Sequence, residues 1–220
     1  VGGCLTLIGL SQGLTEGTQI SMNERRIDLV VTRRGMIEVF GGSLPESLQA
    51  RIAGVAGVEA VSAELDTFLQ VNDDTHAVVA GWRETDFEFR EMPLVRGRLP
   101  RPGAGEVVLG DQLAEALKLD LGAEVILNFA PYRVVGVSGF SSGIMRGTAI
   151  MPLADAQALL GRCRLVEDLA HIAGRIDIGD VVRDGADAGL GDVEAGGGRA
   201  EDRMQRQDAR LRPAKSAALT

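Results

Sequence analysis

The sequence predicts an α+β fold with a helix before the first strand. Three observations predict it: a strand, a helix and a strand follow one another over residues 27–71, short strands surround one small helix over 106–138, and a strand and a helix end the pattern over 148–161. The first unit is typical of half of a split βαβ motif, and the last could be its return half.

Alternating apolar residues predict the two strands of the first unit. In the segment IDLVVTRRG, Ile27, Leu29 and Val31 lie on one face of a strand that ends at Gly35. In VEAVSAELDTFLQVN, the same alternation recurs. Its inward positions are Val61, Ala63 and Leu65.

The helix between these strands is predicted from a start signal. Ser43 is placed as the N-cap, Pro45 falls in the first turn, and Glu46 stands three residues after the serine, where its carboxylate can reach the cap N–H. The apolar face of this helix comprises Leu48, Ile52 and Val55.

The middle of the chain reads as a β-rich module. EVVLG predicts a strand, Asp111 caps the helix QLAEALKL, and the chain turns at Gly122 into a further strand, to which YRVVGVSGF pairs as an antiparallel neighbour. A strand through Ile150 and a helix from Pro152 to Gly161 then complete the pattern. The buried positions of the two helices are Leu113, Ala114, Leu117, Leu153, Ala156, Leu159 and Leu160.

Composition excludes several functions. The 220 residues include 31 acidic and 23 basic ones, for a net charge of −8, which would repel a phosphate backbone, so no nucleic-acid partner is predicted. The two cysteines, Cys4 and Cys163, specify neither a disulfide framework nor a zinc site.

No catalytic residue and no cofactor is predicted. Gly41 and Gly42 precede a helix, but neither a GxxxxGK[ST] nor a GxGxxG pattern occurs in the chain. The histidines, His76 and His171, lie outside any nucleophile motif. We therefore expect a protein that is not an enzyme.

A metal site is also not predicted. Asp73, Asp74 and His76 are metal-ligand types gathered at one turn, but adjacent turn positions splay their side chains apart, and no ligand at helical spacing completes a coordination sphere. We interpret this segment as a solvated turn.

An aromatic cluster follows this turn, with two interpretations. Trp82, Phe87, Phe89 and Met92 could cover the edge of a small core, or form a contact patch for a partner protein, where such residues are enriched. Both interpretations are kept here.

The two ends of the chain differ from its middle. Residues 1–20 are predicted to be the remnant of a transmembrane helix and its stalk, with a soluble element and a lipoprotein site as alternatives, because the apolar run is shorter than the about 20 residues that cross a bilayer. Residues 166–220 are of low complexity and are expected to be disordered. An out-of-frame translation of GC-rich DNA is one hypothesis for that tail.

The ordered series DLVVTRRG, LPESLQARIAGVAGVEAVSAEL, VVAGW, GRLPRPGAGEVVLGDQLAEALKLDLGAEVIL, YRVVGVSG and GTAIMPLADAQALLG resembles the MacB-type periplasmic core domain of FtsX-family ABC-transporter permeases. The resemblance places that domain at residues 21–165. It implies two lobes: an α+β lobe from residues 28–70 and 147–163, and an inserted β-rich lobe at about 76–140.

The resemblance also implies a function. Such a domain projects outside the cytoplasm from a permease in the cell membrane, which couples the motion of a cytoplasmic ABC ATPase to substrate export, lipoprotein extraction or an envelope partner. Implied partners are that ATPase, a second permease subunit as a homodimer or paired permease, a membrane-fusion protein, and the membrane through the N-terminal helix. The alternative is a soluble envelope binding or scaffold module without a transport role.

Overall fold

The computed structural model describes residues 17–33, 44–72, 75–161, 165–166, 168–173 and 193–196. A helix over residues 17–24, here called the N-terminal helix, comes first. The strands are β1 (Leu29–Arg33), β2 (Leu44–Pro45), β3 (Val58–Val71), β4 (Thr75–Trp82), β5 (Leu94–Gly97), β6 (Glu106–Gly110), β7 (Glu124–Leu127), β8 (Ala130–Ser138), β9 (Thr148–Pro152), β10 (Leu165–Val166), β11 (Asp168–Ala173) and β12 (Val193–Gly196). The other helices are α2 (Leu48–Ala53), α3 (Phe87–Arg90), α4 (Asp111–Leu117), α5 (Gly143–Arg146) and α6 (Leu153–Leu160).

Ten of the described strands form one mixed sheet. Its order is β12-β1-β11-β3-β4-β9-β6-β8-β5, with β7 pairing to both β3 and β8. The remaining two, β2 and β10, pair with each other. The mixture of short helices with this sheet confirms the predicted α+β class, and the N-terminal helix precedes β1 as expected.

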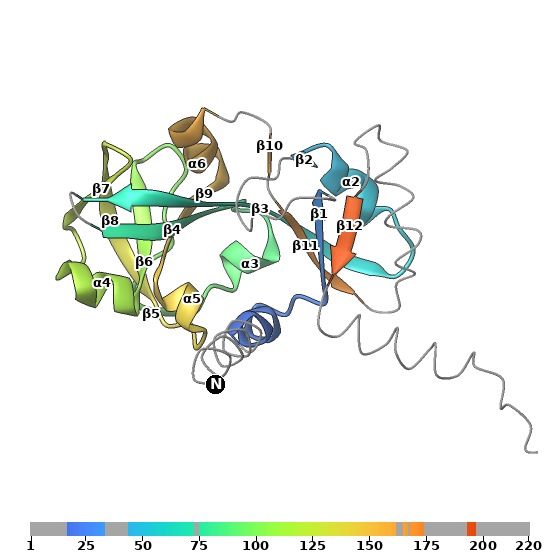
Figure 1. Cartoon of the computed structure of the whole chain (residues 1–220), viewed down its shortest axis with the longest axis horizontal. Coiled ribbons are helices and arrows are strands. Elements are labelled where there is room, and N and C mark those ends of the chain that lie inside the picture. The colour runs from blue at the N-terminus through green and yellow to red at the C-terminus, as the bar shows by residue number, and fades with distance from the viewer. Residues whose placement is uncertain are drawn as a thin grey trace, which may run out of the picture.

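The long strand β3 joins two lobes (Figure 1). Its first half pairs with β11 in the first lobe, which also holds β1, β12 and α2. Its second half pairs with β4 in the β-rich lobe, which holds β4 to β9 with α4, α5 and α6. Glu64 pairs with Asp168 on one side and with Trp82 on the other, so it marks the point where β3 passes from one lobe to the other.

The helix α2 begins later than predicted. Its first residue is Leu48, preceded by Ser47, whereas Ser43 lies outside the described residues. Leu44 and Pro45 pair instead with β10, and the Glu46 carboxylate accepts a hydrogen bond from Arg83. Backbone pairing and an ion pair therefore use the residues that the capping signal assigned to the helix.

The chain from β9 to α6 lies in the β-rich lobe, not in the first lobe where the resemblance placed it. β9 runs parallel to β4 and antiparallel to β6, between the two. α6 packs closely on β4, since a Cβ added at Gly81 would come within 2.4 Å of the Ala156 Cβ. The small residues at this contact allow the helix to approach the strand.

Two described segments of the predicted disordered tail are strands of the sheet, whereas residues 174–192 and 197–220 lie outside the described part of the chain. β11 starts at Asp168, inside the expected tail, and inserts between β1 and β3. β12 then pairs with β1. The first half of β3 needs a hydrogen-bonding neighbour on this side, and β11 supplies it.

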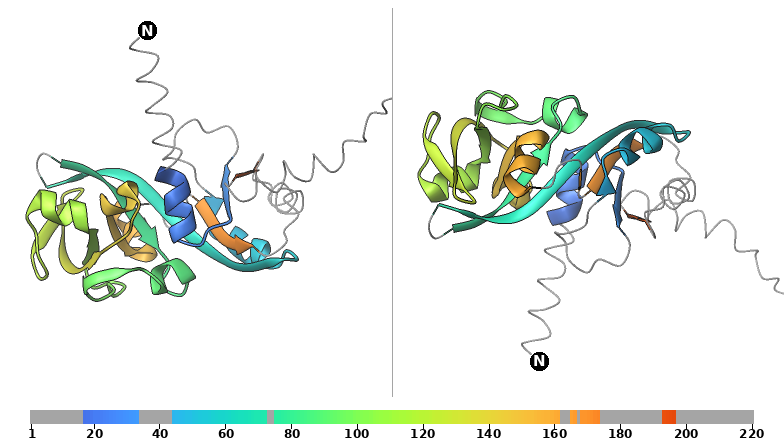
Figure 2. Two further views of the ribbon diagram at one scale, coloured as in Figure 1. Left: turned by 90° about the horizontal axis from the view of Figure 1, so that it is seen from below. Right: turned by 90° about the horizontal axis from the view of Figure 1, so that it is seen from above.

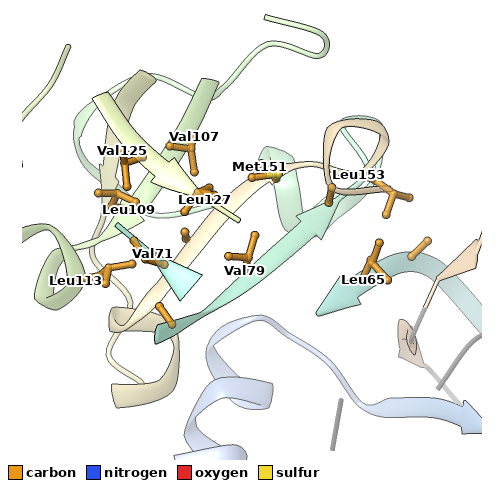
Figure 3. Packing of buried hydrophobic residues seen from close by; sticks show 14 of the residues in the cluster. Leu65, Val71, Val79, Val107, Leu109, Leu113, Val125, Leu127, Met151 and Leu153 are labelled. Carbon is orange, nitrogen blue, oxygen red and sulfur yellow. The ribbon is translucent and has the colours of Figure 1, made fainter. Parts of the chain in front are cut away.

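The β-rich lobe has an apolar core between its sheet and its helices (Figure 3). The predicted strands over EVVLG and YRVVGVS are present, the turn predicted at Gly122 has a positive φ of 85°, and α6 ends at Gly161 with φ 64°. The labelled core residues are Leu65, Val71, Val79, Val107, Leu109, Leu113, Val125, Leu127, Met151 and Leu153.

The N-terminal helix lies against the middle of the molecule, beside α3 and α5 (Figures 1 and 2). Among the helices of the described residues, none has the length and apolar character required to cross a bilayer. Residues 1–16, which hold most of the predicted remnant, lie outside the described part of the chain.

Candidate functional site

The candidate site lies where the N-terminal helix meets the sheet. Four side chains from four parts of the chain converge there: Arg25 just after the N-terminal helix, Glu64 on β3, Trp82 at the end of β4 and Glu88 on α3. We call this cluster the joint. It stands at the crossing point of the two lobes, because Glu64 is the residue at which β3 passes between them.

Arg25 binds both carboxylates of the joint. Its Nη2 donates to the Glu64 Oε2 at 2.6 Å, and its Nε donates to the Glu88 Oε1 at 2.8 Å. The Arg25 side chain is 10% exposed and the two carboxylates are 6% and 0% exposed. Breaking such a buried pair leaves an uncompensated charge, so the chain segment after the N-terminal helix is held firmly.

Trp82 contacts both Glu64 and Arg25 in the joint. Its indole Nε1–H donates to the Glu64 Oε1 at 2.7 Å, and the Arg25 guanidinium lies 4.8 Å from its ring centroid, within cation–π range. The ring also meets Phe140 edge to face at 6.1 Å. Glu64 is thereby fixed by a donor on each carboxylate oxygen.

The position of Glu64 follows from the alternation of β3. Val61, Ala63 and Leu65 point into the apolar core, as predicted, so the intervening residues face the other side of the sheet. That other face carries Ser62, Glu64 and Asp66, and the N-terminal segment and α3 cover its central carboxylate.

A second contact lies beside the joint. The Glu24 carboxylate accepts hydrogen bonds from the Ser141 N–H at 2.7 and 2.8 Å and from the Ser142 N–H at 3.3 Å. Ser142 also donates through its hydroxyl to the Gly17 carbonyl at 3.3 Å. Each end of the N-terminal helix is therefore tied to the segment that begins α5.

Charge is unbalanced inside the joint. Burial raises the pKa of Glu88 to about 7, although the neighbouring Arg25 opposes this rise, and the charge of Glu64 adds to it. Burial alone would lower the pKa of Arg25, but the charges of Glu64, Glu88 and Asp66 together raise it. The arginine therefore stays charged, and Glu88 is the carboxyl group that can take up a proton.

A second arginine–carboxylate cluster holds the loop before β6. The Glu106 carboxylate accepts bidentate hydrogen bonds from Arg98, at 2.5 and 2.7 Å, and further ones from the Arg101 side chain and backbone N–H. Hydrogen bonds from Arg98 and Arg101 lower the pKa of Glu106. We call these three residues the loop clamp. The Gly103 N–H donates to Asp155 on α6, which fixes the tip of the same loop.

The aromatic cluster singled out in the sequence is buried. Trp82, Phe87, Phe89 and Met92 are 0%, 6%, 4% and 7% exposed. Trp82, Phe89 and Met92 belong to a second core cluster below the joint, together with Phe140. This burial agrees with the core interpretation, and a role of the four residues in partner contact stays a prediction.

The turn interpreted as solvated lies partly outside the described residues, which omit Asp73 and Asp74. His76 stacks on Phe68 with 5.8 Å between ring centroids. Among the residues that the structure describes, no group of three or more His, Cys, Asp or Glu side chains is placed to hold a metal ion.

The sequence alone does not predict the joint, because its four members come from distant segments. No local pattern marks Arg25, Glu64 or Glu88, and the aromatic cluster marks Trp82 without its polar partners. One signal was available: a strand with polar residues at every second position beside an apolar face, as in Ser62, Glu64 and Asp66, predicts that a polar partner covers it.

Comparison with known proteins decides the family. The sequence profile of the MacB-like periplasmic core domain matches residues 1–188. The chain belongs to this family. The resemblance in the sequence is thus confirmed, and the match extends beyond residue 165, in agreement with the position of β11 in the sheet.

Two solved structures share the fold of this MacB-like domain. The extracellular domain of the noncanonic ABC-type transporter YknZ from Gram-positive bacteria has a TM-score of 0.60 and 17% identity, covering 77% of this chain and 98% of its own. The periplasmic region of MacB from Actinobacillus actinomycetemcomitans has a TM-score of 0.59 and 16% identity, covering 88% and 99%. No curated protein sequence matches the chain.

Proposed function

We propose that this chain is the extracytoplasmic domain of an ABC transporter permease and that it passes motion driven by a cytoplasmic ATPase to a cargo or an envelope partner. The domain catalyses no reaction itself. The family membership supports the permease assignment. The observation that carries the mechanical role is the burial of Arg25 between Glu64 and Glu88.

The joint is suited to transmitting force for a geometric reason. The N-terminal helix is bonded at the strand position where the two lobes meet, so its displacement acts on both lobes at once. The Glu24 contact fixes the same helix to α5 of the β-rich lobe. A pull on the helix would turn the lobes relative to each other about β3.

The proposal includes further partners. A second permease subunit, as a homodimer or paired permease, and a membrane-fusion protein are the partners that the family resemblance favours. The alternative proposal is a soluble envelope binding or scaffold module. Location separates the two, because a permease domain fractionates with membranes and retains an ABC ATPase when its parent protein is purified.

The test uses the parent permease with its ATPase in membranes. Spin labels at Glu59 in the first lobe and at Phe129, which is 82% exposed in the β-rich lobe, report the distance between lobes. We expect ATP to change this distance in the otherwise unmodified permease, and Arg25→Met to abolish the change while ATP hydrolysis continues. Arg96→Met is the matched control, since Arg96 pairs with the exposed Asp120.

Two results would count against the proposal. An unchanged ATP response in the Arg25→Met permease would show that motion does not pass through the joint. Failure of any ABC ATPase to copurify with the parent protein would favour the envelope module.

A further inference from the structure

The joint contains more carboxylate side chains than basic ones. Arg25 is the cation that contacts Glu88, whereas Glu64 and Glu88 are both carboxylates bonded to it. Asp66, on the same face of β3, adds a third negative charge that acts on Arg25. From β4 the joint includes the neutral indole of Trp82. With both glutamates ionised, the buried cluster would carry an excess negative charge, which is costly to remove from water.

Glu88 is the member least suited to a permanent charge. Its side chain is 0% exposed, and its Oε2 has no hydrogen-bond partner among the described residues, whereas both oxygens of Glu64 accept strong ones. The neighbouring Ser62 favours the ionised form of Glu88, but burial opposes that form more strongly. Glu91 and Arg26, which pair with each other nearby, are exposed and screened by solvent.

We propose that Glu88 acts as a proton-dependent lock of the joint, so that the N-terminal segment is held more tightly at acidic than at alkaline pH outside the cytoplasm. With Glu88 neutral, Arg25 and Glu64 remain as a balanced pair on the face of Trp82. With Glu88 ionised, the second carboxylate favours an opened joint in which water reaches it. The inference concerns the joint of the proposed function and rests on that function for its use in the membrane.

The direction follows from linkage. Burial raises the pKa of Glu88 to about 7 in the closed joint, against an ordinary 4.5 for an opened, hydrated one. The closed joint therefore holds its full advantage below about pH 4.5 and loses it as the pH rises through 7. Each pH unit between the two values changes the equilibrium about tenfold, so the ceiling is about 300-fold.

Trp82 allows a direct test on the whole chain, because it is the single tryptophan of the sequence and lies in the joint. We expect its fluorescence to change with a midpoint near pH 7 and to show no such change in Glu88→Gln. The matched control Glu91→Gln removes an exposed carboxylate one turn away and keeps the transition. A variant with His76→Gln and His171→Gln keeps it too, which excludes the histidines as its source.

Amide exchange gives a second readout of opening. The Arg25 and Ile27 N–H groups donate to the carbonyls of Ser21 and Met22. After correction for intrinsic rates, we expect their protection to fall about 100-fold from pH 5 to pH 8 in the wild type and to stay level in Glu88→Gln.

Each contrary result overturns the lock. These are a flat fluorescence titration of the wild type near pH 7, an unchanged transition in Glu88→Gln, and protection that rises with pH. The fluorescence titration of the wild type needs no variant, so its outcome decides the proposal even if Glu88→Gln does not fold. A normal titration combined with an ATP response that does not need Arg25 would instead refute the proposed function alone.

Discussion

The joint and the loop clamp use the same residue types in opposite proportions. In the joint one arginine serves two carboxylates, whereas in the loop clamp two arginines serve Glu106. The pKa of Glu88 is accordingly raised to about 7, mainly by burial, and that of Glu106 is lowered, mainly by hydrogen bonds from Arg98 and Arg101.

The difference teaches that the ratio of cations to carboxylates, together with access to solvent, decides what an ion cluster can do. Arg98 and Arg101 are 48% and 71% exposed, so the loop clamp has both of its cations in water around one buried carboxylate, and it keeps one protonation state at neutral pH. The joint is closed to water and has one carboxylate in excess. The first cluster fixes a loop, and the second can respond.

The largest effect is expected from removing the cation of the joint. Arg25→Met leaves the Glu64 carboxylate buried without its counter-charge, and we expect a loss of about 3–5 kcal/mol in the free energy of unfolding, measured by urea denaturation at pH 7. Arg26→Met is the control, since Arg26 is 63% exposed, and its loss should stay below about 1 kcal/mol. Equal losses in the two variants would contradict this view of the joint.

A gain is expected from removing the excess acid. Glu88→Gln keeps the shape of the protonated side chain, so at pH 8 it should be more stable than the wild type by about 1–3 kcal/mol, and at pH 4.5 the two should be equal. Urea denaturation at both values measures this. A variant that is less stable than the wild type at pH 8 would show that the ionised Glu88 is favourable.

Removing the carboxylate of the loop clamp should lower the free energy of unfolding, whereas removing that of Glu88 should raise it. Glu106→Gln leaves both arginines solvated, so we expect a loss of only about 1–2 kcal/mol at pH 7. Because the pKa of Glu106 is lowered, this loss is present above about pH 4.5 and shrinks as the pH falls below it. Glu124→Gln, an exposed substitution, serves as the control, and a loss that grows with acidity would refute the assignment.

The smallest effect is expected at a half-exposed pair. Arg146 donates to both carboxylate oxygens of Asp111 at 2.9 Å, and both side chains are more than one-third exposed. A double-mutant cycle of Asp111→Asn and Arg146→Gln should give a coupling below about 1 kcal/mol, reduced further by salt. A larger, salt-independent coupling would place this pair with the joint.

Much of the fold could be predicted from periodicity and turn chemistry. The alternation of Val61, Ala63 and Leu65 places β3, and Gly122 and Gly161 mark turns where φ is positive. Local signals were weaker where another interaction competes for the same residues. Ser43 and Glu46 have a capping pattern, but the adjacent Leu44 and Pro45 pair with β10.

The joint could not be predicted because no local pattern brings its members together. Glu64 and Glu88 lie 39 and 63 positions after Arg25 in the sequence, and only the meeting of the two lobes makes the three residues neighbours. Likewise, β9 belongs to the β-rich lobe because it pairs with both β4 and β6. Such placements depend on tertiary packing, which single residues do not specify.

The position of β11 has a consequence for biogenesis. β1 and β3 are both made early, yet the strand that separates them is translated about a hundred residues after β3 begins. A nascent chain therefore exposes two unsatisfied strand edges until Asp168 to Ala173 have emerged, and such edges favour aggregation. Folding of the nascent domain would accordingly benefit from a holding chaperone that shields the early strands until the later segment arrives.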